Sequence, residues 1–457
     1  MLTEKLSTIE RRAIFGLSSI MSLRMIGLFM VLPLFSLYAS HLSGASPALI
    51  GLSMGIYGLF QAIFQIPFGI LSDHLGRKPI ILLGLIIFAL GSLISGLAHS
   101  IEWLIIGRSL QGAGAVGSTI LALMADLTRE EQRTKAMAIA GITIGFSFSI
   151  AMLLGPLLTQ WLPVHSLFFL AIFFAAIAIV VLFIAIPTPQ HEEWHRDTEP
   201  ELTSFPTLLK TPELARLNLG IFILHAVFTA SFIVIPLSLQ QFSGFSIHQQ
   251  WQIYLPSLLA AFVISLFCIG MAERKQQLKP YFVGAILFLI IAEIFLWARP
   301  THFISMLIGI CFFFGSFSLL EAFLPSLVSR TAPATRKGSA LGLYSCAQFL
   351  GIFVGGALGG WLYGKFSFSG VYFFCIILSL TWLILAFFMQ PPRYLVTKMW
   401  RLLPAQQASW EMIAAKLQLI PGMIEVALIK EDGIAYLKME RHTVTHPDFI
   451  QLKEQTK

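Results

Sequence analysis

Charge is scarce in this chain. Of its 457 residues, 12% are Asp, Glu, Lys or Arg, while 56% are hydrophobic and the mean hydropathy is +0.81. A soluble globular domain is about one quarter charged. So few charged side chains could not cover so apolar a core in water, and we therefore expect lipid to be the solvent. The composition predicts an integral membrane protein.

Cysteine and catalytic motifs are scarce as well. The four cysteines, at positions 268, 311, 346 and 375, lie in apolar runs and form no Cys-X-X-Cys pair, so we expect neither a disulfide framework nor a metal site. No nucleophile elbow, phosphate-binding loop or ligand cluster occurs, which argues against an enzyme and a cofactor. The net charge of +7 does not indicate nucleic-acid binding, because Lys and Arg lie in short loops between apolar runs.

Long apolar runs dominate what is present. A helix needs about 20 mostly apolar residues to cross the bilayer core, and Leu167–Ile186 is such a run without a charged residue. We predict twelve transmembrane helices, near residues 13–39, 48–71, 79–98, 102–125, 135–160, 166–187, 217–241, 250–272, 280–298, 302–325, 338–362 and 369–390.

Cations divide the loops into two sets. Every second loop, beginning with the one between the second and third spans, carries two or three Lys or Arg residues, whereas the other loops hold only Arg299 and Lys365. Under the positive-inside rule, the cationic loops and both termini are cytoplasmic.

The two halves of the chain repeat at an offset of 200 to 203 residues. Val31–Leu34 in the first span matches Val234–Leu237 in the seventh, and Lys78-Pro79 matches Lys279-Pro280. Both halves keep the same orientation because six spans separate them. This is the parallel repeat of carriers whose halves rock about an axis along the membrane normal.

Composition divides the chain into four parts. Residues 1–187 and 217–391 form two six-helix bundles, joined by a polar linker at 188–216, and residues 392–457 are too polar for lipid. Strand patterns, helix patterns and one turn signal in the last part predict a small ferredoxin-like α+β domain. The strands are expected at 395–402, 424–429 and 434–439, the helices at 405–419 and 447–452, and the turn at 431–433.

The most specific motif lies in the loop between the second and third spans. It reads Gly69-Ile-Leu-Ser-Asp73-His-Leu-Gly76-Arg77-Lys78 and places one carboxylate among cations. Gly69 would allow close helix contact, and Gly76 would allow a tight turn. Asp73 caps a helix N-terminus or pairs with Arg77. The simpler alternative is a loop that only fixes topology.

Small residues and a buried cation mark other spans. Arg108-Ser-Leu-Gln111 places an arginine in the fourth span, where it normally faces the protein interior or a water-filled cavity. Glycine-rich faces in the fifth and eleventh spans predict either helices that only pack closely or, because they stand at equivalent places in the two halves, surfaces that move against each other. These faces contain Gly141, Gly145, Gly155 and Pro156 in the fifth span, and Gly355 and Gly356 in the eleventh.

Five ionisable residues inside the spans are candidates for the cavity or for coupling: Arg24, Arg108, His225, Glu293 and Glu321. His225 and Glu321 are both candidates to carry a proton, with a structural role as the alternative for each. Arg24 could bind an anionic group or balance Glu321. Glu293 either belongs to this set or lies near the membrane interface.

These motifs resemble those of the major facilitator superfamily. The segment 69–78 resembles its loop signature, 108–115 its fourth-span signature, and Gly155-Pro156 its antiporter signature, so the resemblance covers about residues 10–390. Together with the extra C-terminal domain, they are similar to bacterial members of the drug:proton antiporter branch. That similarity implies the bacterial inner membrane as location and a proton gradient, without a cofactor, as energy source.

The resemblance also implies a conformational latch. Asp73 would contact the start of the eleventh helix, and Arg77 would pair with Asp126 at the end of the fourth span. The sequence departs from the family pattern in two places. Thr159-Gln160 replace a Gly-Gly pair in the fifth span, and the first span has Arg24 where members of this branch usually have a carboxylate.

Three functions remain open. The motifs favour proton-coupled efflux of a small, largely apolar compound by alternating access. Arg24 and Arg108 favour an uptake or export carrier for a small organic anion. The C-terminal domain favours a membrane sensor that signals to a cytosolic partner. That domain is also similar to heavy-metal-associated domains but lacks their cysteine pair, so we expect no metal binding there.

Overall fold

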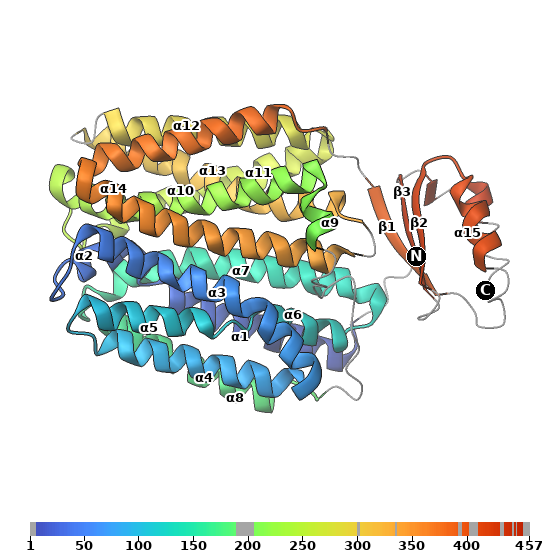
Figure 1. Cartoon of the computed structure of the whole chain (residues 1–457), viewed down its shortest axis with the longest axis horizontal. Helices are drawn as coiled ribbons and strands as arrows, with labels where there is room; N and C mark the ends of the chain where they lie inside the picture. The colour runs from blue at the N-terminus through green and yellow to red at the C-terminus, as the bar shows by residue number, and fades with distance from the viewer. Residues whose placement is uncertain are drawn as a thin grey trace.

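The computed structural model describes residues 6–188, 205–298, 302–333, 336–391, 395–401, 410–429, 434–440, 443–444 and 446–450. Two helical bundles lie side by side, and a small sheet domain sits beyond one end of them (Figure 1). We call the end beside this domain the domain end and the opposite end the far end. The fold class predicted from the sequence is confirmed.

The first bundle contains the helices α1 (Thr8–Phe29), η1 (Leu32–Leu34), α2 (Phe35–Ala39), α3 (Pro47–Leu75), α4 (Arg77–Gly96), α5 (Ile101–Ala113), α6 (Gly117–Asp126), α7 (Glu130–Leu158) and α8 (Ser166–Ile184). The second contains α9 (Phe205–Leu209), α10 (Pro212–Ser243), α11 (Trp251–Arg274), α12 (Leu278–Ala298), α13 (Phe303–Thr331) and α14 (Lys337–Phe387). We call these bundles the N-half and the C-half.

Ten stretches of the described chain are helices long and apolar enough to cross a membrane. One of them, the 51-residue α14, contains the non-helical residue Ser367 and reverses direction there, so it supplies two spans. The short helices α5 and α6 together supply another. The structure therefore contains the twelve spans that the sequence predicts.

The fourth span differs from the continuous helix predicted at 102–125. It is broken between α5 and α6 at Gly114, whose backbone angles (φ −72, ψ 50) leave the helical region. The freed Gly114 carbonyl oxygen accepts a hydrogen bond from Arg24 Nη2 at 3.0 Å. A partner in another helix thus stabilises the break, and such a partner has no signal in the local sequence.

The two halves share one structural device. Lys78 Nζ donates to the carbonyl oxygen of Ile186 at 2.7 Å, and Lys279 Nζ donates to that of Phe387 at 2.9 Å, with 108 residues between donor and acceptor in both cases. Each acceptor lies at the C-terminal end of the last helix of its half, where cations are favourable. This clamp repeats the Lys-Pro match seen in the sequence.

The halves meet most closely at the far end, along α3 and α14. A Cβ atom added to Gly51 would lie 2.2 Å from the Gly356 carbonyl oxygen, and one added to Gly58 would lie 2.4 Å from that of Phe349. Only glycine permits this approach of two backbones. Gly355 packs equally closely on the backbone of Ala226 in α10.

The glycines expected to pack along α7 do not all do so. Gly155, which precedes Pro156, lies against the backbone of Met30, but a Cβ atom added to Gly141 or Gly145 would meet nothing within 4 Å. Both of these residues lie near the middle of α7. Contact between the halves is concentrated at the far end, so the face of α7 that carries these two glycines has no close neighbour, although Ala136 and Ala140 on the same helix are buried in the N-half core.

The C-terminal domain contains β1 (Leu395–Arg401), α15 (Trp410–Gln418), β2 (Met423–Ile429) and β3 (Ile434–Glu440). Its sheet is antiparallel with the order β1-β3-β2, the arrangement expected of a ferredoxin-like domain. Trp400, Trp410 and Leu437 belong to its buried core. The predicted turn at 431–433 lies outside the described residues, and the helix predicted at 447–452 is described at 447–450.

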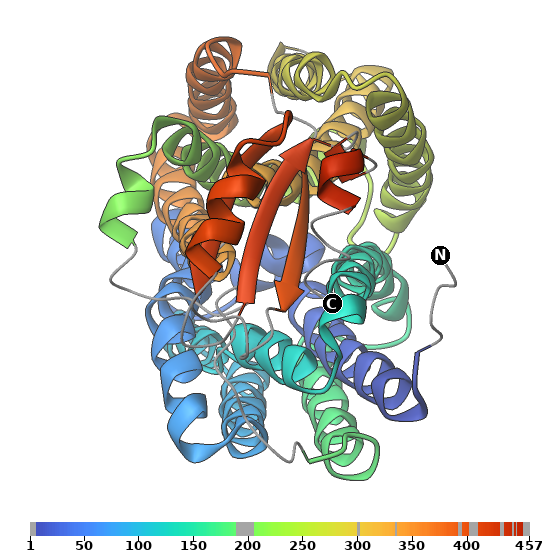
Figure 2. The same ribbon diagram turned by 90° about the vertical axis from the view of Figure 1, so that its right-hand side faces the viewer.

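Viewed from the domain end, this domain lies in front of the middle of the bundle (Figure 2). Lys438 of β3 is 6% exposed, and its Nζ donates at 2.8 Å to the carbonyl oxygen of Ala332, directly after α13. Burial lowers the pKa of this amine, and the nearby carboxylate of Glu425 on β2 opposes that shift. The domain is thus bound to the C-half by a buried lysine.

Candidate transport site

The latch cluster, which we define as Asp73, Arg77 and Asp126, lies at the domain end of the N-half. Arg77 is 2% exposed, and its Nε is 3.2 Å from Asp126 Oδ2. Its Nη1 donates to Asp73 Oδ1 and, at 2.7 Å, to Ser72 Oγ. Gly76 has φ +90 and forms the turn that brings these side chains together.

All these partners belong to the N-half. Among the described contacts, no hydrogen bond or ion pair joins Asp73 to α14, so the contact expected with the start of the eleventh helix is not made in this conformation. Gly69 does not enforce close packing either, because an added Cβ would meet only Ser118 Oγ, at 3.7 Å. Lys78 belongs to the helix clamp rather than to this cluster.

Arg24 of α1 lies in the interior of the N-half and is 2% exposed. Its Nη2 donates to Gln61 Oε1 at 2.8 Å and to the Gly114 carbonyl oxygen at 3.0 Å. Its Nε is buried without a hydrogen-bond partner. No ion pair with a described carboxylate forms, so Glu321 does not balance Arg24 in this conformation.

Arg108 of α5 is 5% exposed. Its Nη1 donates to Gln111 Oε1 at 2.7 Å, and Gln111 Nε2 donates in turn to Ser92 Oγ at 2.8 Å. The guanidinium carbon lies 5.4 Å from the ring centre of Phe35 and 5.2 Å from that of Tyr57, a distance at which aromatic rings attract cations. Its Nε also has no partner.

The C-half contains a different polar group. Gln348 of α14 donates through Nε2 to His225 Nε2 at 2.9 Å and to Glu321 Oε1 at 3.2 Å. His225 Nδ1 faces the Ile221 carbonyl oxygen at 3.3 Å. This pattern fits a neutral imidazole with its proton on Nδ1. The structure thus brings together His225 and Glu321, which the sequence named separately.

Glu321 is positioned to exchange a proton. Its Oε2 lies 3.8 Å from His225 Nε2 and has no hydrogen-bond partner. The ring of His225 packs 5.6 Å from that of Phe317, so the surroundings are apolar on one side. A carboxylate in such surroundings is stabilised by taking up a proton, and it can release that proton when the surroundings become more polar.

Glu293 of α12, expected either among the interior groups or near the membrane interface, lies in the last third of its helix. It is completely buried, and its Oε1 accepts a hydrogen bond from Ser231 Oγ at 2.8 Å. The Ser231 hydroxyl also lies 3.6 Å from Cys375 Sγ. No described cation pairs with Glu293, so it is a buried carboxylate, separate from Glu321, whose side chain is 37% exposed.

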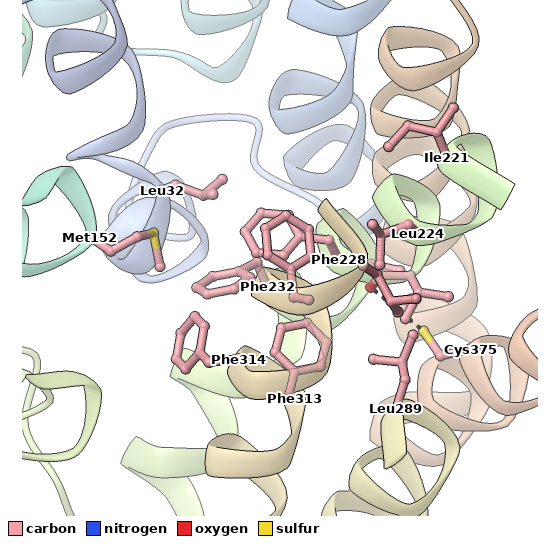
Figure 3. Close-up of a cluster of buried hydrophobic side chains, with 14 of the residues drawn as sticks. Leu32, Met152, Ile221, Leu224, Phe228, Phe232, Leu289, Phe313, Phe314 and Cys375 are labelled. Atoms are coloured by element: carbon pink, nitrogen blue, oxygen red, sulfur yellow. Dashed lines mark hydrogen bonds between the residues drawn. The ribbon is translucent and has the colours of Figure 1, made fainter. Parts of the chain in front are cut away.

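Aromatic rings fill the space between the halves. The Phe228 ring centre lies 4.4 Å from that of Phe317 and 5.6 Å from that of Phe148, which belongs to α7 of the N-half. In Figure 3, Phe228 and Phe232 lie beside Phe313, and Leu32 and Met152 of the N-half approach this group from the other side. An apolar body would find a complementary surface here.

Sequence reasoning missed one glutamine in each half and one tyrosine in the N-half. Gln61, Tyr57 and Gln348 orient or surround the charged groups, although none was singled out. Amide side chains are rare in apolar spans because they need partners there, so Gln61 and Gln348 carried a usable signal. Their partners are set by tertiary packing, which the sequence alone does not give.

Comparison with known proteins also points to a membrane transporter. The sequence matches the model of the Major Facilitator Superfamily over residues 17–321 and 278–415. It is 43% identical to the inner membrane transport protein YajR of Escherichia coli (strain K12), over 95% of this chain and 96% of that protein. It is 28% identical to Multidrug resistance protein 2 of Bacillus subtilis (strain 168), over 79% of this chain and 91% of that protein.

Solved structures agree on the fold. The crystal structure of a mutant of the nucleoside transporter NupG superimposes with a TM-score of 0.65 at 14% identity, covering 84% of this chain and 100% of that one. The match to the family model and the 43% identical relative confirm the family resemblance of the sequence motifs. Together with the twelve spans and the repeated halves, these matches show that the chain belongs to the major facilitator superfamily and is a multi-pass inner-membrane transporter of a small molecule, with the fold of alternating-access carriers.

Proposed function

We propose that this carrier exports a small compound with a largely apolar body in exchange for protons. The observation that carries the proposal is the group formed by His225, Gln348 and Glu321. It contains a carboxylate with one unpartnered oxygen beside a neutral imidazole, at the centre of a half whose other interior groups are mostly apolar. A proton on Glu321 removes a charge that the apolar surroundings disfavour.

Alternating access then links this proton to the substrate. The positive-inside rule makes the domain end cytoplasmic, so the present conformation, packed at the far end along α3 and α14, faces the cytoplasm. Substrate from the cytoplasm occupies the space beside Phe228 and displaces the proton from Glu321. The halves rock, the substrate leaves at the far end, and a proton from outside returns the carrier to its first state.

The latch cluster sets the balance between the two states. In this conformation Asp73 bonds to Arg77, and none of the described contacts of Asp73 reaches α14. When the domain end closes, the N-terminus of the eleventh helix approaches Asp73, and the helix dipole at this end favours a carboxylate. This contact would stabilise the outward-facing state, and its absence suits the inward-facing one.

The C-terminal domain acts as a regulatory part of the carrier in this proposal. The bond between Lys438 and Ala332 fixes the domain beside the C-terminal end of α13. A ligand or protein that displaced the domain would also free this end of α13, which precedes the helix that the latch would contact. A changed transport rate in Lys438→Met, which loses the docking bond, would support this role, whereas unchanged transport in that variant would contradict it.

Transport in everted membrane vesicles tests the coupling directly. An acidified lumen is monitored with a pH-sensitive dye while cationic, neutral and anionic organic compounds are added in turn. We expect at least one compound to dissipate the gradient with the wild type, and this response to vanish in Glu321→Gln. Glu293→Gln is the matched control, because it removes a buried carboxylate that lies outside the group, and it should retain the response.

Two results would contradict the proposal. One is that no compound of the three classes dissipates the gradient although the protein is present in the membrane. The other is that Glu321→Gln and Glu293→Gln behave alike, because the coupling would then not depend on the group around Gln348.

A further inference from the structure

The interior of the N-half holds two positive charges without a counter-charge. Arg24 and Arg108 are at most 5% exposed, and no described carboxylate forms an ion pair with either of them. Their hydrogen-bond partners are neutral, namely Gln61 and Gly114 for the first and Gln111 for the second. A buried charge that lacks a charged partner is expensive, so two of them in one half require compensation from a group outside the described chain.

Unused hydrogen-bond donors gather around Tyr57. The hydroxyl of Tyr57, Arg24 Nε and Arg108 Nε are all buried without a hydrogen-bond partner. The Tyr57 hydroxyl interacts electrostatically with both guanidinium groups and approaches Arg24 without forming a hydrogen bond of normal geometry. The side chain of Tyr57 is 2% exposed, and its ring lies 5.2 Å from the guanidinium carbon of Arg108.

A purely structural role leaves this arrangement unexplained. Buried arginines that only hold helices together normally use every donor on carbonyl or carboxylate oxygens. Here Gln61 and the Gly114 carbonyl orient Arg24, Gln111 orients Arg108, and the Nε donor of each guanidinium group remains unused. A ligand oxygen would accept hydrogen bonds from donors that are oriented in this way and unused.

We infer that Arg24, Arg108 and Tyr57 form the binding site for the anionic group of the transported compound, a carboxylate on an aromatic or otherwise apolar body. This inference rests on the proposed function and names the substrate class of its site. A planar guanidinium group presents paired donors that match the two oxygens of a carboxylate, and a phenolic hydroxyl adds a third donor.

The apolar body has a continuous aromatic surface to follow. Phe29, five residues after Arg24 on α1, packs 5.2 Å from Phe148. Phe148 packs 5.6 Å from Phe228 and 5.7 Å from Phe317 in the C-half, and Phe317 lies beside His225. The rings thus form a continuous path from α1 of the N-half to the proton site of the C-half.

The two sites also lie at the same depth, on either side of the contact between α3 and α14. The ring of Tyr57 lies 6.3 Å from that of Phe349, which is the neighbour of Gln348. Cys346 Sγ lies 3.9 Å from the carbonyl oxygen of Ala62, which follows Gln61. A compound bound between them would place its anion near the arginines and its apolar body near Glu321.

Binding to the purified full-length chain tests the inference. The probes are 2-naphthoate, its neutral amide, the lipophilic cation tetraphenylphosphonium, and chloride or inorganic phosphate. We expect naphthoate to raise the thermal unfolding midpoint of the wild type and the amide to have little effect. Arg108→Gln should weaken naphthoate binding by about ten- to a hundredfold, the effect of losing a charged hydrogen bond.

Tyr57→Phe keeps the test informative if an arginine variant fails to fold. It removes one oxygen from the site, and we expect it to weaken naphthoate binding by about three- to tenfold. Arg216→Gln is the matched control, because Arg216 lies at the domain end of the C-half and binds a helix-terminal carbonyl oxygen there. It should leave binding unchanged.

Three outcomes would overturn the inference. These are equal stabilisation by naphthoate and its amide, unchanged naphthoate binding in Arg24→Gln, Arg108→Gln and Tyr57→Phe, and stabilisation by chloride or phosphate alone, which would assign the site to an inorganic ion. Failure of the proposed function looks different. Naphthoate would then bind through the arginines but dissipate no proton gradient, whereas proton-coupled transport of cations without naphthoate binding would overturn only the anion site.

Discussion

The two halves of this carrier share a frame and differ in their interiors. Both halves hold the end of their last helix with a lysine, through Lys78 in one and Lys279 in the other. In the described part of the chain, the middle of the N-half contains the buried Arg24 and Arg108, with which no carboxylate pairs, and the C-half contains Glu293 and Glu321, with which no Lys or Arg pairs. Duplication preserved the parts that hold helices together, and the charged groups diverged to opposite signs.

The opposite charges of the two interiors suit two different tasks, ligand recognition in the N-half and proton exchange in the C-half. A site that is permanently positive can recognise a ligand but cannot give up a proton, because an arginine stays charged. A carboxylate beside a neutral histidine can take up and release a proton, and it recognises a ligand only weakly. The latch cluster is a second difference between the halves. Its pair Arg77–Asp126 in the N-half is buried, whereas the pair Arg330–Glu273 in the C-half is partly exposed.

The largest expected effect comes from the latch cluster. Arg77→Met leaves Asp126 buried without its partner, which should lower the free energy of unfolding by about 3–5 kcal/mol. Arg330→Met breaks the 2.5 Å pair with Glu273 in the C-half, whose carboxylate is 43% exposed, and should cost at most about 1 kcal/mol. Thermal unfolding of both variants in one detergent compares them, and equal losses would mean that the halves do not differ in this respect.

The second effect concerns the contact between α3 and α14. A Cβ atom added to Gly356 would lie 2.6 Å from the Gly51 carbonyl oxygen, so Gly356→Ala should disfavour packing at the far end by about 1–3 kcal/mol. Gly141→Ala introduces the same atom into open space and is the control. Labelling of cysteines introduced near Pro47 should increase in the first variant only, and similar labelling in both would contradict the packing described here.

A third effect tests the attachment of the C-terminal domain to the C-half. Lys438→Met removes the bond to Ala332 and should weaken docking by about 1.5 kcal/mol. Hydrogen exchange in β3 should then become faster, while exchange in the far-end parts of the bundle stays unchanged. Unaltered exchange in β3 would show that the lysine does not hold the domain.

Docking should also depend on pH. Burial lowers the pKa of Lys438, so the docked domain holds this proton less firmly than the free domain does. Docking is therefore independent of pH below the lowered pKa and becomes stronger as pH rises from there toward the ordinary value of 10.5. The same exchange measurement over this range should show slower exchange in β3 at higher pH, and the dependence should disappear in Lys438→Met.

The smallest effect tests what the halves share. Lys78→Met and Lys279→Met each remove a cation from a helix C-terminus, and each should cost about 0.3–1 kcal/mol in stability. The two losses should be equal within error. A much larger loss for Lys78→Met would show that this lysine also serves the neighbouring latch cluster.

Much of the frame could be predicted from the sequence. Apolar runs located the twelve spans, and the offset of Lys78 and Lys279 located the repeat, because both patterns depend on local composition. The period-two pattern after Pro391 located the strands of the C-terminal domain for the same reason. Residues 69–78 likewise identified the latch cluster, because its turn at Gly76 is a local feature.

The rest depends on contacts between distant segments. The break at Gly114 requires Arg24 of another helix, and the burial of Glu293 follows from Ser231 on α10. The open surroundings of Gly141 reflect the conformation of the carrier, which one sequence does not specify. Gln348 was missed because its role lies in joining His225 to Glu321, a link that only the packed helices reveal.

Infrared difference spectroscopy of the purified carrier would test most directly whether Glu321 is the proton site. The account predicts a protonated carboxyl band that disappears when the pH is raised or a transported compound is added, that is lost in Glu321→Gln, and that persists in Glu293→Gln. A titrating, substrate-sensitive band that survives Glu321→Gln would contradict the account, because the proton would then be held elsewhere.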